Sequence, residues 1–137
     1  MTTLRVLISG HPVLSSSPKL PHITGEVGRI AASGRIPKQN GWLLAVVHTT
    51  RALDTTLGEI VKIKGWANNN NHSLGGYLGL LHVNSILSQQ EKDDYNKEIV
   101  WKRNMYMHEA GAMPSQLDAD KILSGMHSCA STVLARL

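Results

Sequence analysis

The stretch SQQEKDDYNKEIVWKRNMYMHEAG, residues 88–111, decides the fold that the sequence predicts. Ser88 and Glu91 have the spacing of a capping box, in which each side chain accepts a hydrogen bond from a backbone N–H at the start of a helix. Gly111 is a typical helix stop. No residue between these signals breaks a helix, so we expect one long helix from Ser88 to about Ala110.

The second half of this helix carries polar residues inside an apolar pattern. At about 100° per residue, Arg103 projects into the middle of an apolar arc along one face. The arc contains Tyr95, Ile99, Val100, Tyr106, Met107 and Ala110. Asn104 and His108 lie one turn apart and therefore share a face. That face borders a second apolar strip, Trp101 and Met105, which we interpret as a docking surface for a partner subunit.

The polar residues suggest a ligand site. Burying Arg103 without a partner would cost several kcal/mol, and a phosphate could supply that partner because a guanidinium binds it through two parallel hydrogen bonds. His108 titrates near neutral pH and can move a proton, while Asn104 is placed to hold its imidazole in one tautomer. The alternatives are an arginine that extends its charged end to solvent and a histidine that belongs to the ordinary surface.

The chain outside this segment predicts further helices. From Trp42 to Lys64, apolar side chains recur at three- and four-residue steps, as on one face of a helix. A last helix with its own apolar stripe follows the capping signal of Ser115 and Asp118. Residues 73–86 are apolar and rich in glycine, and their length fits a short helix. Nothing alternates with the period of a strand, so we expect an all-α bundle of four or five helices.

The first part of the chain has a different composition. Three prolines and several serines before residue 25 indicate irregular, turn-rich chain, and a short helix is expected from Thr24 to Arg35. We therefore divide the chain into an irregular N-terminal extension, residues 1–37, and a helical domain, residues 38–137.

Composition limits the class of protein. A chain of 137 residues fits one domain, and its single cysteine, Cys129, excludes an internal disulfide and a cysteine-rich zinc site. No apolar run reaches the roughly 20 residues of a membrane span, and the apolar stretch near the start is too short for a signal peptide. We expect a cytoplasmic protein. Residues 1–37 carry four basic side chains and one acidic one, which suits a nucleic acid or an acidic partner, or an ordinary solvated surface.

The string RNMYMH, Arg103 to His108, resembles the Arg-x4–6-His motif of the HEPN superfamily (higher eukaryotes and prokaryotes nucleotide-binding domains). In that family the motif lies near the end of a long helix in an all-α bundle, before a turn and a final helix, as expected here. The resemblance covers about residues 40–137, whereas residues 1–37 match no family pattern. The glycine-rich segment 73–86 is an unusual lead-in to the motif helix.

The resemblance implies a metal-independent endoribonuclease that uses no cofactor and acts as a homodimer. Arg103 and His108 of both subunits would meet in one cleft, with Asn104 as the polar residue after the arginine. His108 would assist proton transfer as an RNA 2′-hydroxyl attacks the neighbouring phosphate, and Arg103 would stabilise the charge on the phosphoryl oxygens. Trp101 and Met105 would form the dimer contact. Many members are toxins of toxin–antitoxin pairs or effectors of phage defence, so an antitoxin or regulatory protein is an expected partner.

Two other classes stay open. Some HEPN domains are not enzymes, and the same cleft would then bind nucleotide, RNA or a partner protein without turnover. The chain would otherwise be a structural subunit that docks through Trp101 and Met105. The segment HEAGA, from His108 to Ala112, begins like a zinc-protease motif but lacks the second histidine, so we reject that class.

Overall fold

The computed structural model describes residues 2–33, 38–68, 70, 72–109 and 111–137, and every regular element among them is a helix. In chain order, the elements are α1 (Thr2–Gly10), α2 (Pro12–Ser15), α3 (Leu20–Ser33), α4 (Lys38–Ile63), α5 (Leu74–Val83), α6 (Gln89–Tyr95), the π-helix η1 (Asn96–Val100), α7 (Trp101–His108) and α8 (Gln116–Ala135).

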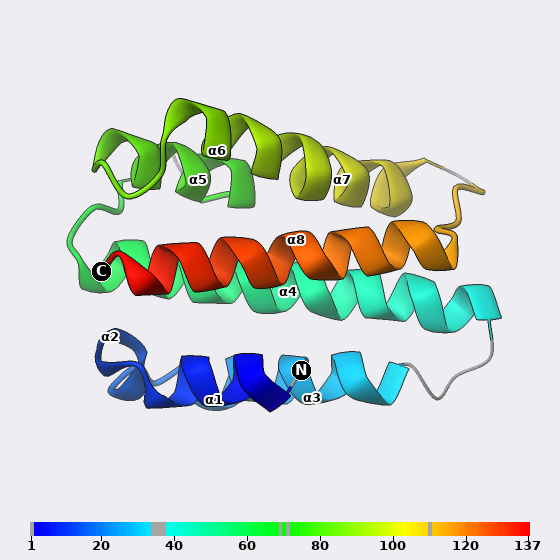
Figure 1. The fold of residues 1–137 in the computed structure, drawn as a ribbon, viewed down its shortest axis with the longest axis horizontal. Helices are drawn as coiled ribbons and strands as arrows, with labels where there is room; N and C mark the ends of the chain where they lie inside the picture. Colours follow the sequence, from blue (N-terminus) through cyan, green and yellow to red (C-terminus); the bar gives the residue numbers. More distant parts are fainter. Residues whose placement is uncertain (1, 34–37, 69, 71, 110) are drawn as a thin grey trace.

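The helices form a compact bundle with three visible layers (Figure 1). Helices α1 to α3 lie along one side, α4 and α8 run side by side through the middle, and α5 to α7 cover the other side. If α6, η1 and α7 are taken as one continuous run, the described residues form seven helices. The prediction of an all-α fold is therefore confirmed, whereas the expected number of four or five helices is too low.

The N-terminal segment is mainly helical, so the prediction of irregular chain is wrong for residues 2–23, whereas the helix predicted from Thr24 is present as part of α3. Pro12 opens α2 and Pro21 is the second residue of α3. A helix needs no backbone N–H at these positions, so proline starts a helix there instead of breaking it. His11 caps α2, because its Nδ1 accepts a hydrogen bond from the backbone N of Val13 at 3.2 Å.

The N-terminal helices also contribute to the core. Their buried side chains are Leu4, Ile8, Leu14, Ile23, Val27 and Ile30. Helix α3 begins four residues before the predicted start at Thr24. The predicted end at Arg35, and the boundary between extension and domain, fall at residues 34–37 and lie outside the described residues.

Helix α4 is the centre of the bundle and contacts α3, α5, α7 and α8. It confirms the helix predicted from Trp42 and extends it toward the N-terminus to Lys38. The helix stops at Gly65, which has a left-handed φ of +74°. There the N–H of Trp66 bonds to the carbonyl of Val61 at 2.8 Å, as in a glycine-terminated helix end.

The long helix predicted from Ser88 is confirmed as one continuous run, but its middle part, η1, is π-helical. The capping box is present: Ser88 Oγ accepts from the backbone N of Glu91 at 3.1 Å, and Glu91 Oε1 accepts from the backbone N of Ser88 at 2.9 Å. A π-turn holds about one residue more than an α-turn, so the 100° pattern does not continue through it. Within this turn, Ile99 and Val100 are both buried. The predicted end at Ala110 lies outside the described residues.

Helix α8 matches its prediction closely. Ser115 Oγ accepts from the backbone N of Asp118 at 3.1 Å and caps the helix. Cys129 is buried in the main core, where burial raises its pKa to about 12, so it acts as a small apolar side chain. The predicted stripe is buried at Ala119, Ile122, Met126, Ala130, Val133 and Leu134. None of the helices in the described part of the chain is long and apolar enough to cross a bilayer.

Candidate functional site

The three residues predicted to be catalytic lie on α7, two in its middle and one at its end. Arg103 is half-buried, and its Nη1 donates to Asn104 Oδ1 at 3.3 Å. Asn104 and His108 are exposed. Arg103 is close enough to α4 for its positive charge to act on the carboxyl group of Asp54. Because Arg103 and His108 lie about 140° apart around α7, a single chain does not bring them to one point.

Trp101 and Met105, the predicted docking strip, have different surroundings. Trp101 is 64% exposed, one of the most exposed large apolar side chains in the described residues. Met105 instead packs partly buried against a small core cluster that includes Val46 and Ile122. The predicted strip is therefore open to solvent mainly at Trp101, since Met105 is half-buried against α4 and α8, and its role as a docking surface stays a prediction.

The end of α7 is held in place by a hydrogen bond to the start of α8. The buried Tyr106 donates its hydroxyl proton to Asp118 Oδ2 at 2.6 Å. Burial, followed by the hydrogen bond to Asp118, raises the pKa of Tyr106 to about 12, so the tyrosine stays protonated and keeps donating. This bond fixes the position of the turn that carries His108.

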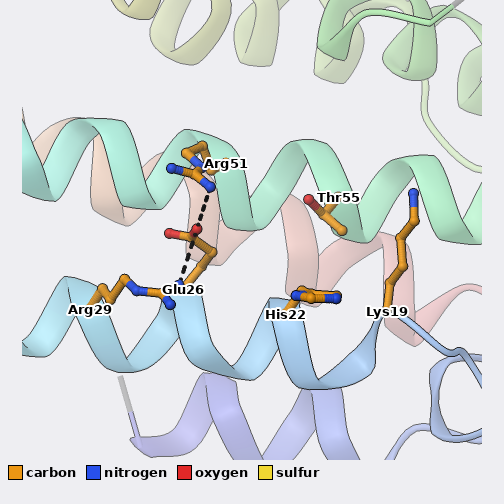
Figure 2. Close-up of a pocket in the computed structure, with 6 residues that line it drawn as sticks. All are labelled: Lys19, His22, Glu26, Arg29, Arg51 and Thr55. Carbon is orange, nitrogen blue, oxygen red and sulfur yellow. Dashed lines mark ion pairs between the residues drawn. The ribbon is translucent and has the colours of Figure 1, made fainter.

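A cleft of about 600 Å³ lies between α3 and α4, and its lining is rich in positive charge (Figure 2). Its lining residues are Lys19, His22, Glu26, Arg29, Arg51 and Thr55. Figure 2 shows α8 behind α4, so the cleft opens on the face of α4 that α8 does not cover. Three permanent positive charges in the lining face one negative charge.

The negative charge belongs to Glu26, a carboxylate shared by three basic side chains. His48 Nδ1 lies 2.7 Å from Oε2, while Arg51 Nη2 and Arg29 Nη1 lie 3.0 Å and 3.2 Å from Oε1. The side chain of Glu26 is only 7% exposed, whereas those of Arg29 and Arg51 are 57% and 64% exposed. The carboxylate therefore lies at the base of the cluster, with the arginine side chains reaching toward solvent.

A second buried carboxylate, Glu59 on α4, anchors the lysine of the same cleft. Ser17 Oγ donates to Glu59 Oε2 at 2.6 Å, and Lys19 Nζ lies 3.7 Å from Oε1. The side chain of Glu59 is 4% exposed and that of Lys19 is 56% exposed. Both buried glutamates thus hold the inner side of a basic group whose outer side faces solvent.

A smaller cleft, of about 270 Å³, continues the first one along α4. The two clefts share Lys19 and Thr55, and the smaller one adds Asp54 and Tyr77. Burial raises the pKa of Asp54, and the positive charges of Arg103 and Lys19 oppose that rise. Asp54 therefore lies in the cleft beside the basic one, on a helix that also contacts α7.

Sequence reasoning missed this cluster of residues on α3 and α4. Glu26 and Arg29 are one turn apart on α3, and His48 and Arg51 are one turn apart on α4. This spacing can be read from the sequence, and it predicts that each pair shares one face of its helix. The sequence does not say that the two faces meet, since the partners of Glu26 on α4 are more than 20 residues away.

Comparison of the chain with protein-family models, with curated proteins and with solved structures finds no match. Its class is therefore defined by its own fold and sites: an all-α bundle with a basic cleft on the open face of its central helix. In the described part of the chain, no three histidine, cysteine or acidic side chains come together as metal ligands.

Proposed function

We propose that the protein is a metal-independent endoribonuclease that acts as a homodimer. The observation that carries the proposal is the placement of the motif: Asn104 and His108 are exposed on α7, and Arg103 is half-buried beside them. The motif is thus accessible both to an RNA strand and to a second copy of the chain. The exposed Trp101 supplies an apolar contact for that second copy.

The proposed reaction uses the 2′-hydroxyl of the RNA itself. The 2′-oxygen attacks the adjacent phosphorus while His108 of one subunit accepts its proton, and the bond from phosphorus to the 5′-oxygen breaks. The leaving 5′-oxygen takes a proton from the protonated histidine of the other subunit, which yields a 2′,3′-cyclic phosphate. Arg103 stabilises the negative charge on the phosphoryl oxygens. DNA lacks the attacking hydroxyl and is not cleaved.

Dimerisation supplies the geometry that one chain lacks. Arg103 and His108 lie about 140° apart on α7, so two copies that face each other would bring both arginines and both histidines into one shared cleft. The cellular role we propose is that of a toxin or a phage-defence effector, held inactive by an antitoxin or another regulatory protein.

The test is incubation of the purified protein with single-stranded RNA in excess EDTA. We expect cleavage by the wild type, loss of cleavage in Arg103→Ala and in His108→Ala, and unchanged cleavage in the control His127→Ala, which removes a histidine of α8 that lines neither cleft. Circular dichroism checks that each variant is folded. An inactive wild type, or active Arg103→Ala and His108→Ala variants, would reject the proposal.

One observation favours a second candidate, a module that binds RNA or nucleotide without turnover. Arg103 Nη1 donates to Asn104 Oδ1 at 3.3 Å within one chain, so these two polar side chains form one surface on α7 without His108. This candidate predicts saturable binding in calorimetry with intact RNA recovered afterwards, and light scattering that shows a monomer at micromolar concentration would favour it further.

A further inference from the structure

We propose that the cleft between α3 and α4 is a subsite for the backbone phosphates of an RNA strand. The inference deepens the proposed function, on which its choice of ligand rests, but its residues lie on α3 and α4 and not on the motif helix. It is carried by the arrangement of Lys19, Arg29 and Arg51 above two buried glutamates.

The first step is the direction in which the charges face. Both carboxylates are almost fully buried, whereas Lys19, Arg29 and Arg51, which they bind, are more than half exposed. An anion that approaches from solvent therefore meets the cations before the glutamates. The field at the mouth of the cleft is positive even though Glu26 and Glu59 compensate part of the charge beneath it.

The second step is preorganisation. Glu26 holds the guanidinium groups of Arg29 and Arg51 by their inner edges, so both arginines lose side-chain freedom before any ligand arrives. A guanidinium has five donors in a fixed plane, and Arg51 contacts Glu26 through Nη2, so other N–H groups of Arg51 can reach a second acceptor. Phosphate oxygens fit this arrangement, because they accept paired hydrogen bonds from such groups.

The third step is size and reach. The cleft of about 600 Å³ is large enough for a phosphate with its attached sugar, and the hydroxyl of Thr55 adds a neutral donor in its wall. The cleft shares Lys19 and Thr55 with the smaller cleft, which also contains Asp54. The positive charge of Arg103 opposes the rise that burial causes in the pKa of Asp54. A strand with one phosphate in the cleft can continue along α4, which contacts the motif helix α7.

The test measures binding without cleavage. Fluorescence anisotropy measures the binding of a labelled single-stranded RNA to the His108→Ala parent. The variants added to this parent are Arg51→Ala, Lys19→Ala and Arg51→Lys. The matched control is Lys97→Ala, which removes an exposed charge from η1. We expect affinity about tenfold lower in Arg51→Ala and a smaller loss in Lys19→Ala. The plot of log affinity against log salt concentration has a negative slope, and this slope should become less steep by about 0.7 for each phosphate contact removed. Arg51→Lys should recover part of the affinity, and Lys97→Ala should bind within about twofold of its parent.

Competition distinguishes the source of the phosphate. If longer RNA binds more tightly and millimolar inorganic phosphate or nucleotide competes only weakly, the subsite belongs to a strand. Equal competition by free phosphate identifies a small-anion site and overturns the assignment to RNA. Equal binding of RNA by Arg51→Ala and Lys97→Ala, or no RNA binding by the parent at low salt, overturns the subsite itself.

The two proposals fail in different ways. If wild-type protein does not cleave RNA but Arg51→Ala still weakens binding, the ribonuclease proposal fails and the subsite stands. If wild-type protein cleaves RNA and Arg51→Ala cleaves with unchanged KM and kcat, the subsite fails and the ribonuclease stands.

Discussion

Two helix contacts in the bundle differ in the side chains that they bury. The contact between η1 and α8 buries apolar side chains, whereas the contact between α3 and α4 buries charged ones. Beside η1, Gly125 of α8 leaves room for the fully buried Ile99: an added Cβ at Gly125 would lie only 3.2 Å from Ile99 Cγ1. Between α3 and α4, the buried Glu26 binds His48 and Arg51.

The two contacts differ in what they contribute to stability. Close apolar packing stabilises a fold directly, because it removes surface from water and leaves no polar group unpaired. A buried carboxylate must recover its lost hydration from its partners, and an apolar pair of the same size often stabilises as much or more. The charged contact between α3 and α4 should therefore add less to stability than the apolar contact between η1 and α8.

The largest predicted effect tests the apolar contact. Replacing Ile99 by alanine removes a fully buried side chain next to Gly125 and should lower the free energy of unfolding by about 2–5 kcal/mol. Urea denaturation at neutral pH measures the change. Val83→Ala, at a site 76% exposed, is the control and should stay within about 0.5 kcal/mol of wild type. If Ile99→Ala lowers the free energy of unfolding no more than the control does, η1 and α8 pack loosely.

The second effect tests the charged contact. Glu26→Ala leaves His48 and the two arginines without their shared carboxylate and should lower stability by about 1–3 kcal/mol. The loss stays below that of Ile99→Ala because the arginine side chains are half-exposed and regain water. Glu26→Gln, which keeps the size and an acceptor, should lose less. If Glu26→Ala lowers the free energy of unfolding more than Ile99→Ala does, the charged contact stabilises the fold more than the apolar one.

The third effect is a pH dependence of stability. It arises where the start of α6 meets the end of α8. Glu91 forms a two-bond ion pair with Arg136, at 2.7 Å and 2.9 Å, and this contact lowers the pKa of Glu91 to about 2. A lowered folded-state pKa gives stability that is full above the unfolded pKa, near 4.5, and is lost as pH falls toward 2. Urea midpoints of wild type and Arg136→Ala should therefore differ at pH 7 and converge near pH 2. A constant difference at all pH values would contradict this origin.

The smallest effect concerns the rim of the basic cleft. Arg51→Ala removes a side chain that is 64% exposed, and its unfolding free energy should stay within about 0.5 kcal/mol of wild type. The same substitution should weaken RNA binding, as proposed above. A change that spares stability and lowers binding would set the α3–α4 contact apart from the η1–α8 contact most clearly, whereas a large stability loss would show that Arg51 mainly holds the two helices together.

Local signals were enough to predict much of the fold. Ser88 with Glu91, Ser115 with Asp118, and the stripe of α8 all depend on residues within a few positions of one another, and the structure confirms each of them. The N-terminal helices were missed because Pro12 and Pro21 were taken as breakers, although both stand in the first turn of a helix.

Signals that depend on tertiary contacts were not accessible. The π-turn η1 follows from packing against α5 and α8, and no local pattern marks it. Met105 was placed in a docking strip, although it is half-buried against α4 and α8. The cluster around Glu26 requires α3 and α4 to meet in one register, which the sequence alone does not fix. Arg103, Asn104 and His108 were placed correctly on one helix, but their catalytic role stays a prediction.

The π-turn has a practical consequence for tracing the ancestry of this chain. Because η1 holds one extra residue, a related bundle with an uninterrupted α-helix would be one residue shorter between Tyr95 and Trp101. An alignment counted forward from Ser88 would then shift Arg103 and His108 by one position and hide the motif. Searches for distant relatives should therefore allow a one-residue gap inside this helix, where alignment methods usually penalise it most.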